Sequence, residues 1–317
     1  MKSFKFAALA TIAALSLASP IFAADAPESG QGQTLVTVMP RNGGEALPNI
    51  QTQDLSLKIA GKLSSVTSWA PAKGENSPLE LVLLIDSSAR SSLGTQISEI
   101  QDFVKEMPSH SKMAIAYMEN GRAALAGPLS SDSEAVLKGL HLPGGGSGQS
   151  ASAYFCLSDL AQHWPSTDRS ARREVVMITD GIDFYNLRYD PEDPYVQAAI
   201  TDAARAGLVV YSIYWRSRGY ADNSAADIGG GQNLLLEVTQ ATGGNSYWQG
   251  DGNPVSFDPY FKDLRIRFEN QYRLGFASGL KNKAEIETLS LKVAGSAGKV
   301  TAPQKVWVSP AIQVRGE

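Results

Sequence analysis

The sequence predicts an α/β fold: a doubly wound, mostly parallel sheet with helices on both faces, together with a small β-sandwich built from the N- and C-terminal strands. Three observations support it. Residues 77–278 alternate uninterrupted apolar runs with amphipathic stretches, as strands covered on both faces by helices do. The segments near both ends alternate single apolar and polar residues, which is typical of antiparallel strands with one buried and one solvent-exposed face. The chain has 317 residues and 43% hydrophobic residues, which is enough for a sizeable core.

The middle region supplies the strands and helices of the predicted parallel sheet. Ile97, Ile100, Phe103, Val104 and Met107 mark one helical face, and residues 196–204 carry another. Ligand sites in such sheets lie beyond the carboxyl ends of the strands. Asp86 and Asp180 each close an apolar run, so we expect both carboxylates at one edge of the sheet. The apolar runs are "LELVLLID" (79–86), "KMAIAYME" (112–119), "REVVMITDG" (173–181) and "GLVVYSIYW" (207–215).

The two ends of the chain predict the sandwich. Residues 34–76 contain "TLVTVMP" and "LSLKIAGKLSSVTSW". Toward the C-terminus, "QYRLGFAS" (271–278) and, within residues 279–317, "IETLSLKVAGS" and "KVWVSP" show the same alternation. Neither segment alone can bury a sheet face, so we expect the two to pair. Residues 24–33 are polar and rich in Gly, Pro and Ser, and they predict a disordered lead-in.

The first 23 residues predict export. Lys2 and Lys5 precede a short apolar run, and small residues surround Ala23, as in a secretory signal peptide. We therefore expect a secreted or periplasmic protein with no stable membrane span after cleavage. The formal charge of −4 argues against a nucleic-acid partner. Cys156 is the only cysteine and lies at helical spacing from Leu157 and Leu160, which favours a buried, inert thiol.

The sequence offers no catalytic pattern. Ser87 and Ser88 lack the flanking glycines of a nucleophile elbow, and "PGGGSGQS" (143–150) lacks the lysine of a phosphate loop. The three histidines do not have the spacing of a metal-ligand pair. We therefore do not expect an enzyme.

Several segments together resemble the von Willebrand factor type A (VWA) domain. They are a strand into "IDSSARS", a glycine-rich loop before "SAYFCLSDL", and a strand into "VMITDG". The later "LLLEVTQATGGNSYW" and "DPYFKDLRIRFENQYRLGF" are similar to closing elements of secreted bacterial VWFA-related proteins. The resemblance implies a Rossmann-like domain over residues 77–278 that binds protein partners in adhesion or assembly.

The resemblance also implies a metal-ion-dependent adhesion site (MIDAS) for Mg²⁺ or Mn²⁺. The family uses Asp-x-Ser-x-Ser on the first loop, a threonine on the second and an aspartate on the third. Asp86, Ser88 and Asp180 match this pattern. The second-loop residue corresponds to Ser152, with Ser147 and Ser150 as alternatives.

Arg90 stands where the second serine of the motif belongs, so the implied site is degenerate. A guanidinium has no acceptor and cannot ligate a cation. Either Arg90 turns outward and Ser91 or Ser92 replaces the missing hydroxyl, or Arg90 itself lies between the two carboxylates as a counter-ion. Asp86, Ser88 and Asp180 could instead be simple helix caps.

The loop after Asp180 is rich in Tyr, Asp and Asn, and it predicts a protein-binding rim made by Arg90, Ser147, Asp183 and Tyr185. Ordinary loop packing is the alternative interpretation of the same residues. The predicted function is a protein-binding module, divalent-cation-dependent if the degenerate MIDAS works. The alternative is a metal-independent structural component of the cell envelope with no open site.

Overall fold

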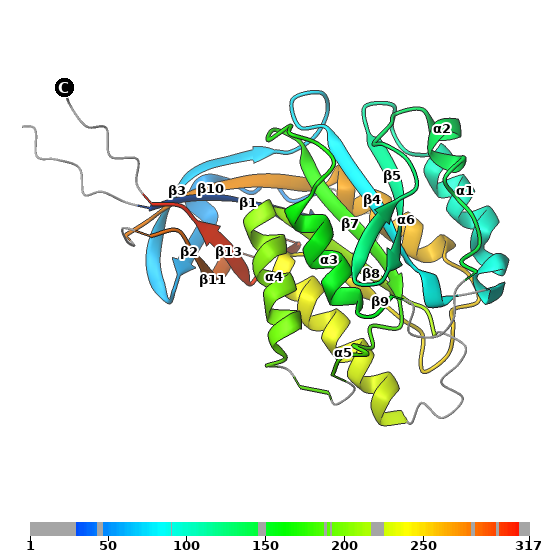
Figure 1. The fold of residues 1–317 in the computed structure, drawn as a ribbon. Coiled ribbons are helices and arrows are strands. Elements are labelled where there is room, and N and C mark those ends of the chain that lie inside the picture. Colours follow the sequence, from blue (N-terminus) through cyan, green and yellow to red (C-terminus); the bar gives the residue numbers. More distant parts are fainter. Residues whose placement is uncertain are drawn as a thin grey trace, which may run out of the picture.

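The computed structural model describes residues 30–42, 47–89, 91–144, 150–186, 189–190, 192–216, 225–279, 283–295 and 298–310. They form a core sheet flanked by helices and a terminal sheet made from both ends of the chain (Figure 1). The expected signal peptide, residues 1–23, lies outside the described residues. In the described ranges, no helix is both long and apolar enough to cross a membrane.

The core sheet is mostly parallel, as predicted. β4 pairs in parallel with β5 and β7, and β8 pairs in parallel with β7 and β9; only the edge strand β6 is antiparallel. Every residue of β4 is buried, which explains its apolar run from Leu81 to Ile85. The strand order is β6 (Arg122–Leu125), β5 (Lys112–Glu119), β4 (Leu79–Asp86), β7 (Arg172–Thr179), β8 (Leu208–Tyr214) and β9 (Ser246–Tyr247).

Helices cover both faces of this sheet (Figure 1). On one face, Leu81 and Leu83 share a core with Phe103 and Phe261, whose rings stack with centroids 4.3 Å apart. On the other face, Val82 packs in the core that contains buried Cys156, and burial raises the pKa of this thiol. The first face carries α1 (Ile97–Lys105), α2 (Ser133–Leu137) and α6 (Asp258–Glu269); the second carries α3 (Ala153–Gln162), α4 (Pro194–Ala206) and α5 (Ala225–Thr242).

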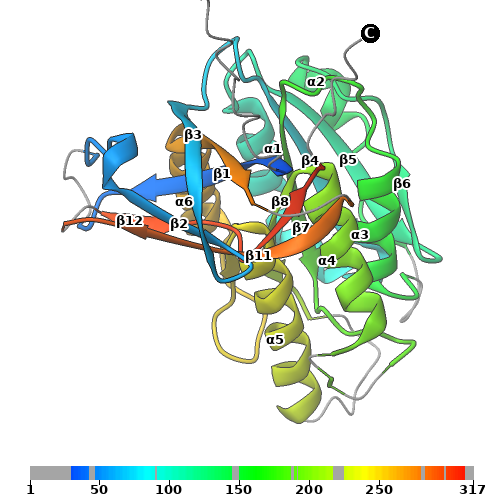
Figure 2. The ribbon, with the colours of Figure 1, turned by 90° about the vertical axis from the view of Figure 1, so that its left-hand side faces the viewer.

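The terminal sheet has seven antiparallel strands drawn from both ends of the chain (Figure 2). A short 3₁₀ helix, η1 (Thr52–Asp54), precedes β2. The backbones of Gln31 in β1 and Ser309 after β13 exchange hydrogen bonds of 3.0 and 2.9 Å, so the sheet curls back on itself. The order is β12 (Lys299–Thr301), β1 (Gly30–Met39), β10 (Gln271–Ser278), β3 (Lys62–Pro71), β2 (Leu55–Ile59), β11 (Glu285–Val293) and β13 (Lys305–Val308).

Two expectations about the ends need correction. The terminal strands do pair, but they form one curled sheet rather than the two sheets of a sandwich, and its apolar face packs against itself through Val36, Leu274 and Phe276. β1 begins at Gly30, so residues 30–33 of the expected disordered lead-in are strand. Their pairing partner is β10, about 240 residues later in the chain, which no local composition reveals. A Cβ on Gly32 would meet the Phe276 ring, so glycine fits there for packing.

Candidate functional site

The carboxyl ends of β4 and β7 lie side by side and define the candidate site. Ile85 pairs with Ile178 in the parallel register, so the loops that follow both strands start from the same edge. β4 ends with Asp86 and continues into the 3₁₀ helices η2 (Ser87–Ala89) and η3 (Ser91–Gln96). β7 ends with Thr179, and Asp180 follows it. The two acidic residues therefore come from one edge of the sheet.

The Asp86 carboxylate is buried and oriented by both strands. Asp86 is only 2% exposed to solvent. Oδ1 accepts a hydrogen bond of 2.8 Å from the Ser88 backbone N–H, and Oδ2 accepts one of 2.7 Å from Thr179 Oγ1. Burial raises the pKa of Asp86, and these hydrogen bonds oppose that rise. The carboxylate is thus held in one orientation.

Two serine hydroxyls face this carboxylate without a hydrogen-bond partner. Ser88 and Ser150 are fully buried, and within the described part of the chain neither Oγ has a partner. Both hydroxyls lie close enough to Asp86 to lower its pKa, yet their geometry falls short of a hydrogen bond. Buried hydroxyls are nearly always paired, so two orphaned ones around one carboxylate need an explanation.

The second-loop serine beside Asp86 is Ser150, the alternative considered from the sequence. Ser152, the favoured candidate, caps α3 by accepting a hydrogen bond of 3.2 Å from the Tyr154 N–H. The Ser150 backbone carbonyl accepts from the N–H groups of Gly121 and Ser152, which fixes this end of the loop. Ser147 and Arg90 lie outside the described residues.

The loop after β7 is tightly held. Asp180 is 1% exposed, and its Oδ1 accepts a hydrogen bond of 3.1 Å from the Ile182 N–H. Gly181 has a φ of +69°, and a Cβ there would lie 2.6 Å from the Gly231 carbonyl oxygen, so α5 approaches this turn closely. The buried Tyr154 hydroxyl donates to the Gly181 carbonyl at 2.7 Å. Burial, with Asp183 and Asp180, raises the pKa of Tyr154.

The expected rim combines a buried acid with exposed aromatic rings. Asp183 Oδ1 accepts from the Tyr185 N–H at 2.9 Å, while its buried Oδ2 has no partner within the described segments. Burial, and then Asp193, raise the pKa of Asp183. Tyr185 is 65% exposed and packs on Phe155, with ring centroids 4.9 Å apart; Tyr195 packs on the same ring at 4.7 Å. The aromatic cluster is therefore supported from below by α3 and open to solvent above.

The residues at this edge fit a hard cation. Mg²⁺ prefers oxygen ligands and keeps several waters, and the edge offers carboxylates from Asp86 and Asp180 with the unpartnered hydroxyls of Ser88 and Ser150. Across the described ranges, no three His, Cys, Asp or Glu side chains cluster as metal ligands. A cation here would therefore depend on the serine hydroxyls.

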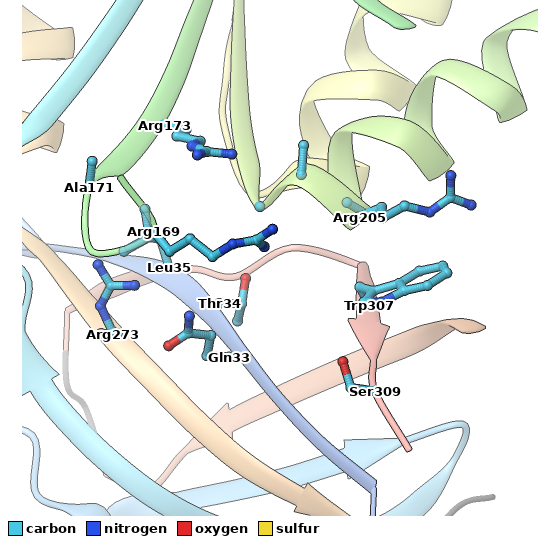
Figure 3. A pocket seen from close by; sticks show the side chains of 13 residues that line it. Gln33, Thr34, Leu35, Arg169, Ala171, Arg173, Arg205, Arg273, Trp307 and Ser309 are labelled. Carbon is cyan, nitrogen blue, oxygen red and sulfur yellow. The ribbon is translucent and has the colours of Figure 1, made fainter. Parts of the chain in front are cut away.

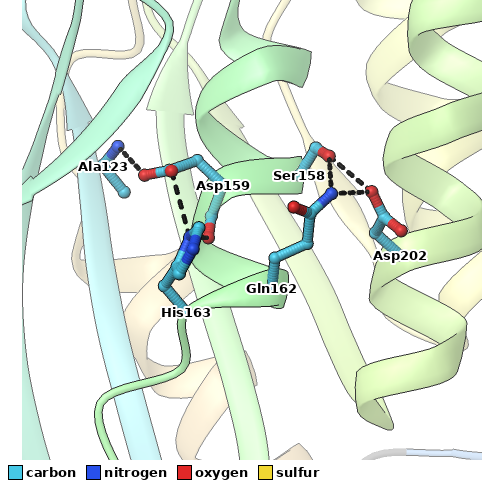
Figure 4. Close-up of polar contacts among 6 residues, drawn as sticks. All are labelled: Ala123, Ser158, Asp159, Gln162, His163 and Asp202. Carbon is cyan, nitrogen blue, oxygen red and sulfur yellow. Dashed lines mark hydrogen bonds and ion pairs between the residues drawn. The ribbon is translucent and has the colours of Figure 1, made fainter.

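Ser158, Asp159 and His163 gather near the end of α3, with the residue types of a hydrolytic triad (Figure 4). The His163 Nδ1 lies 3.2 Å from Asp159 Oδ1, but the Ser158 hydroxyl donates to Asp202 on α4. Gln162 donates to the same Asp202 at 2.7 Å. The serine is thus paired with a carboxylate and not with the imidazole, and the cluster links α3 to α4.

Sequence reasoning missed Thr179 and Tyr154, which hold Asp86 and the Gly181 turn. Thr179 could have been found, because the parallel register that pairs Ile85 with Ile178 places the next residues, Asp86 and Thr179, side by side. Tyr154 carries no comparable signal, since its partner is a backbone carbonyl 27 residues away.

No family model and no curated protein matches this chain. Among solved structures it is similar to an aerotolerance-related membrane protein from Bacteroides fragilis, with 14% identity over 60% of this chain and 98% of that chain and a TM-score of 0.42. It is also similar to the SpRpn10 VWA domain, with 9% identity over 60% of this chain and 96% of that chain and a TM-score of 0.40. A third similar structure is the ArnB paralog VWA2 from Sulfolobus acidocaldarius, with 10% identity over 88% of this chain and 75% of that chain and a TM-score of 0.38. Two of the three are VWA proteins by name, the family that the sequence motifs resemble. At such low TM-scores, this chain's own strand order and contacts define its fold and site.

Proposed function

We propose that this chain is an exported, VWA-like protein-binding module that recognises its partner at the shared carboxyl edge of β4 and β7, with a divalent cation as part of the binding surface. The pair of buried, unpartnered hydroxyls of Ser88 and Ser150 beside the buried Asp86 carries this proposal. Such oxygens are costly to leave unpaired, and a cation would satisfy both at once. The signal-like residues 1–23 support export.

In this proposal the residues have distinct tasks. Asp86 and Asp180 supply the negative charge, and Ser88 and Ser150 supply neutral oxygens. Thr179 and the Ser88 N–H fix the orientation of the Asp86 carboxylate. A bound Mg²⁺ or Mn²⁺ would offer a coordination position to an oxygen of the partner, such as a carboxylate. The exposed Tyr185 and Tyr195 would add apolar contact area beside it.

Arg90 decides how strongly a cation binds. Its permanent charge repels a divalent cation from the two carboxylates. We therefore expect the isolated wild-type chain to bind Mg²⁺ only weakly, so that the cation is held firmly only when an oxygen of the partner completes its coordination, and Arg90→Ser, which restores the motif serine, to strengthen binding. Tight binding by the wild type would contradict this role for Arg90.

A metal-independent structural component of the envelope is the second candidate, and one observation favours it. Both oxygens of Asp86 already accept hydrogen bonds, from the Ser88 N–H and from Thr179, so the carboxylate is stabilised without a cation. In that case binding partners would use other surfaces, and the candidate edge would be closed.

Capture of partners from the native envelope fraction separates the two candidates. The bait would be the mature chain, used with Mg²⁺ and with EDTA, and as the variants Asp180→Ala and Ser150→Ala. Ser158→Ala is the matched control, because this serine lies away from the edge and contacts Asp202. The binding-module proposal predicts that a captured protein is lost with EDTA and with both edge variants, but is kept by the control. Capture that is unaffected by EDTA and by Asp180→Ala supports the structural candidate instead.

A further inference from the structure

A pocket lined by arginines lies at the opposite end of the core sheet from the candidate site. It opens where β7 and β8 begin and where the terminal sheet meets them, and its volume is about 220 Å³ (Figure 3). Arg169 and Arg173 come from the approach to β7 and its start, Arg205 from the last turn of α4, and Arg273 from β10. Four guanidinium groups from three separate segments of the chain therefore line one cavity.

Most of this positive charge takes no part in an ion pair. Arg205 pairs with Asp202 at 3.2 Å, but within the described residues Arg169, Arg173 and Arg273 form no ion pair. The whole chain carries a formal charge of −4, so a cluster of arginines is opposite in sign to the net charge of the protein. Burial, and then the neighbouring Arg169, lower the pKa of Arg173, while Glu80 and Asp168 oppose this. Burial and Arg172 lower the pKa of Arg273. Arg169 and Arg173 are therefore close enough to repel each other, and Arg273 is repelled by Arg172, which does not line the pocket.

The arginines are held in place by neutral groups. Arg173 donates to the backbone carbonyls of Ser166 and Asp168, at 3.0 and 3.2 Å. Arg273 donates to the Ser77 hydroxyl and the Ser170 carbonyl, at 3.0 and 2.8 Å. These contacts fix the side chains without forming an ion pair, although Glu80 and Asp168 partly offset the charge of Arg173.

The fourth arginine and the floor of the pocket complete the arrangement. The Arg205 guanidinium lies 4.7 Å from the centroid of the Trp307 ring, which limits its rotation. Figure 3 shows the polar side chains of Gln33 and Thr34 on β1 and of Ser309 after β13, below Arg169, Arg173 and Arg205. The carboxyl end of α4 also lines the pocket, and the partial negative charge of its helix dipole repels an anion. The full positive charges of the three arginines that form no ion pair exceed this partial charge.

We propose that this pocket binds a phosphate monoester group, either as a free small molecule or as part of a larger one. A planar carboxylate presents two oxygens in one plane, whereas the guanidinium groups reach the cavity from different sides, which suits a tetrahedral oxyanion. Three unpaired positive charges also favour a dianion over a monoanion. The cavity has room for the phosphate and part of the molecule that carries it. Because the pocket joins the core and terminal sheets, a bound anion would also bridge them.

Titration of the mature chain with inorganic phosphate tests the proposal. Calorimetry would be run at pH 8 and constant ionic strength, with acetate titrated in parallel. Arg169→Gln is the test variant, because Arg169 is exposed and its loss leaves the packing intact. Arg122→Gln on β6 is the matched control, since it removes the same charge from an exposed site elsewhere. We expect saturable phosphate binding that Arg169→Gln weakens by about tenfold or more, and that Arg122→Gln leaves unchanged.

A second arm identifies the source of the phosphate. Phosphatidylcholine vesicles with and without phosphatidic acid, whose headgroup is a phosphate monoester, would be sedimented with the same variants. Binding that requires phosphatidic acid and Arg169 supports the proposal and assigns the group to a lipid; binding of inorganic phosphate alone supports it and assigns a soluble ligand. No saturable binding in either arm would overturn it, as would equal losses in Arg169→Gln and Arg122→Gln. Equal affinity for acetate and phosphate would refute the inferred preference of the pocket for a tetrahedral dianion.

Discussion

Glu174 of β7 makes the stability of this protein depend on pH. The residue is fully buried, and within the described part of the chain neither carboxylate oxygen has a hydrogen bond of good geometry. Burial raises the pKa of Glu174 from 4.5 to about 7, although Arg172, Gln271 and Tyr211 oppose the rise. The buried Arg172 directs its own donors to the Phe268 carbonyl and to Gln271. The folded protein therefore prefers the neutral form of Glu174.

The sign and size of the effect follow from the two pKa values. A raised pKa means that the folded state binds the proton more tightly than the unfolded chain does. Protonated Glu174 therefore contributes most to the free energy of unfolding below pH 4.5. That stability is lost as the pH rises to about 7. At about 1.4 kcal/mol for each pH unit, the full loss is about 3 kcal/mol, and most of it falls between pH 5 and pH 8.

Urea unfolding of Glu174→Gln at pH 5 and pH 8 measures this loss. Glutamine cannot ionise, so the variant should lose about 2–3 kcal/mol less stability than the wild type between the two pH values. Glu134→Gln, which removes an exposed carboxylate of α2, is the control for the change in net charge. If wild type and Glu174→Gln show the same difference between pH 5 and pH 8, the reasoning about Glu174 is refuted.

Two further substitutions test the packing of the candidate edge. Thr179→Val keeps the shape of the side chain but removes the donor to Asp86, and should cost about 1–3 kcal/mol at pH 7, measured by urea unfolding; an unchanged midpoint would show that this hydrogen bond is not needed. Gly181→Ala places a Cβ 2.6 Å from the Gly231 carbonyl oxygen and against Leu235, at a φ of +69°. It should lower the free energy of unfolding by about 2 kcal/mol or more, and wild-type thermal stability in that variant would contradict the close approach of α5.

The core sheet could be predicted because its signals are local. β4, β7 and β8 contain the apolar runs 81–85, 175–178 and 208–211, and such runs arise when helices cover both faces of a strand. The shared edge of Asp86 and Asp180 followed, because the carboxyl ends of parallel strands lie together.

The remaining features depend on contacts distant in sequence. Alternation shows that a terminal strand has one buried face, but it does not show whether that face packs on a second sheet or on its own curled sheet. Ser150 and Ser152 lie two residues apart, and only the start of α3 decides which one becomes the cap. The arginines of the pocket are up to about 100 residues apart, and its other lining residues extend from Gln33 to Ser309, so no local pattern indicates it.

The most direct test of the central claim is a calorimetric titration of Mg²⁺ into Arg90→Ser, and into that variant carrying either Ser150→Ala or Ser152→Ala. Asp86, Ser88, Ser150 and Asp180 should hold the cation, so Arg90→Ser should bind Mg²⁺ more tightly than the wild type. The added Ser150→Ala should abolish this binding, whereas Ser152→Ala should weaken the cap of α3 and leave Mg²⁺ affinity in place. No saturable binding by Arg90→Ser, or binding that survives Ser150→Ala, would contradict the claim.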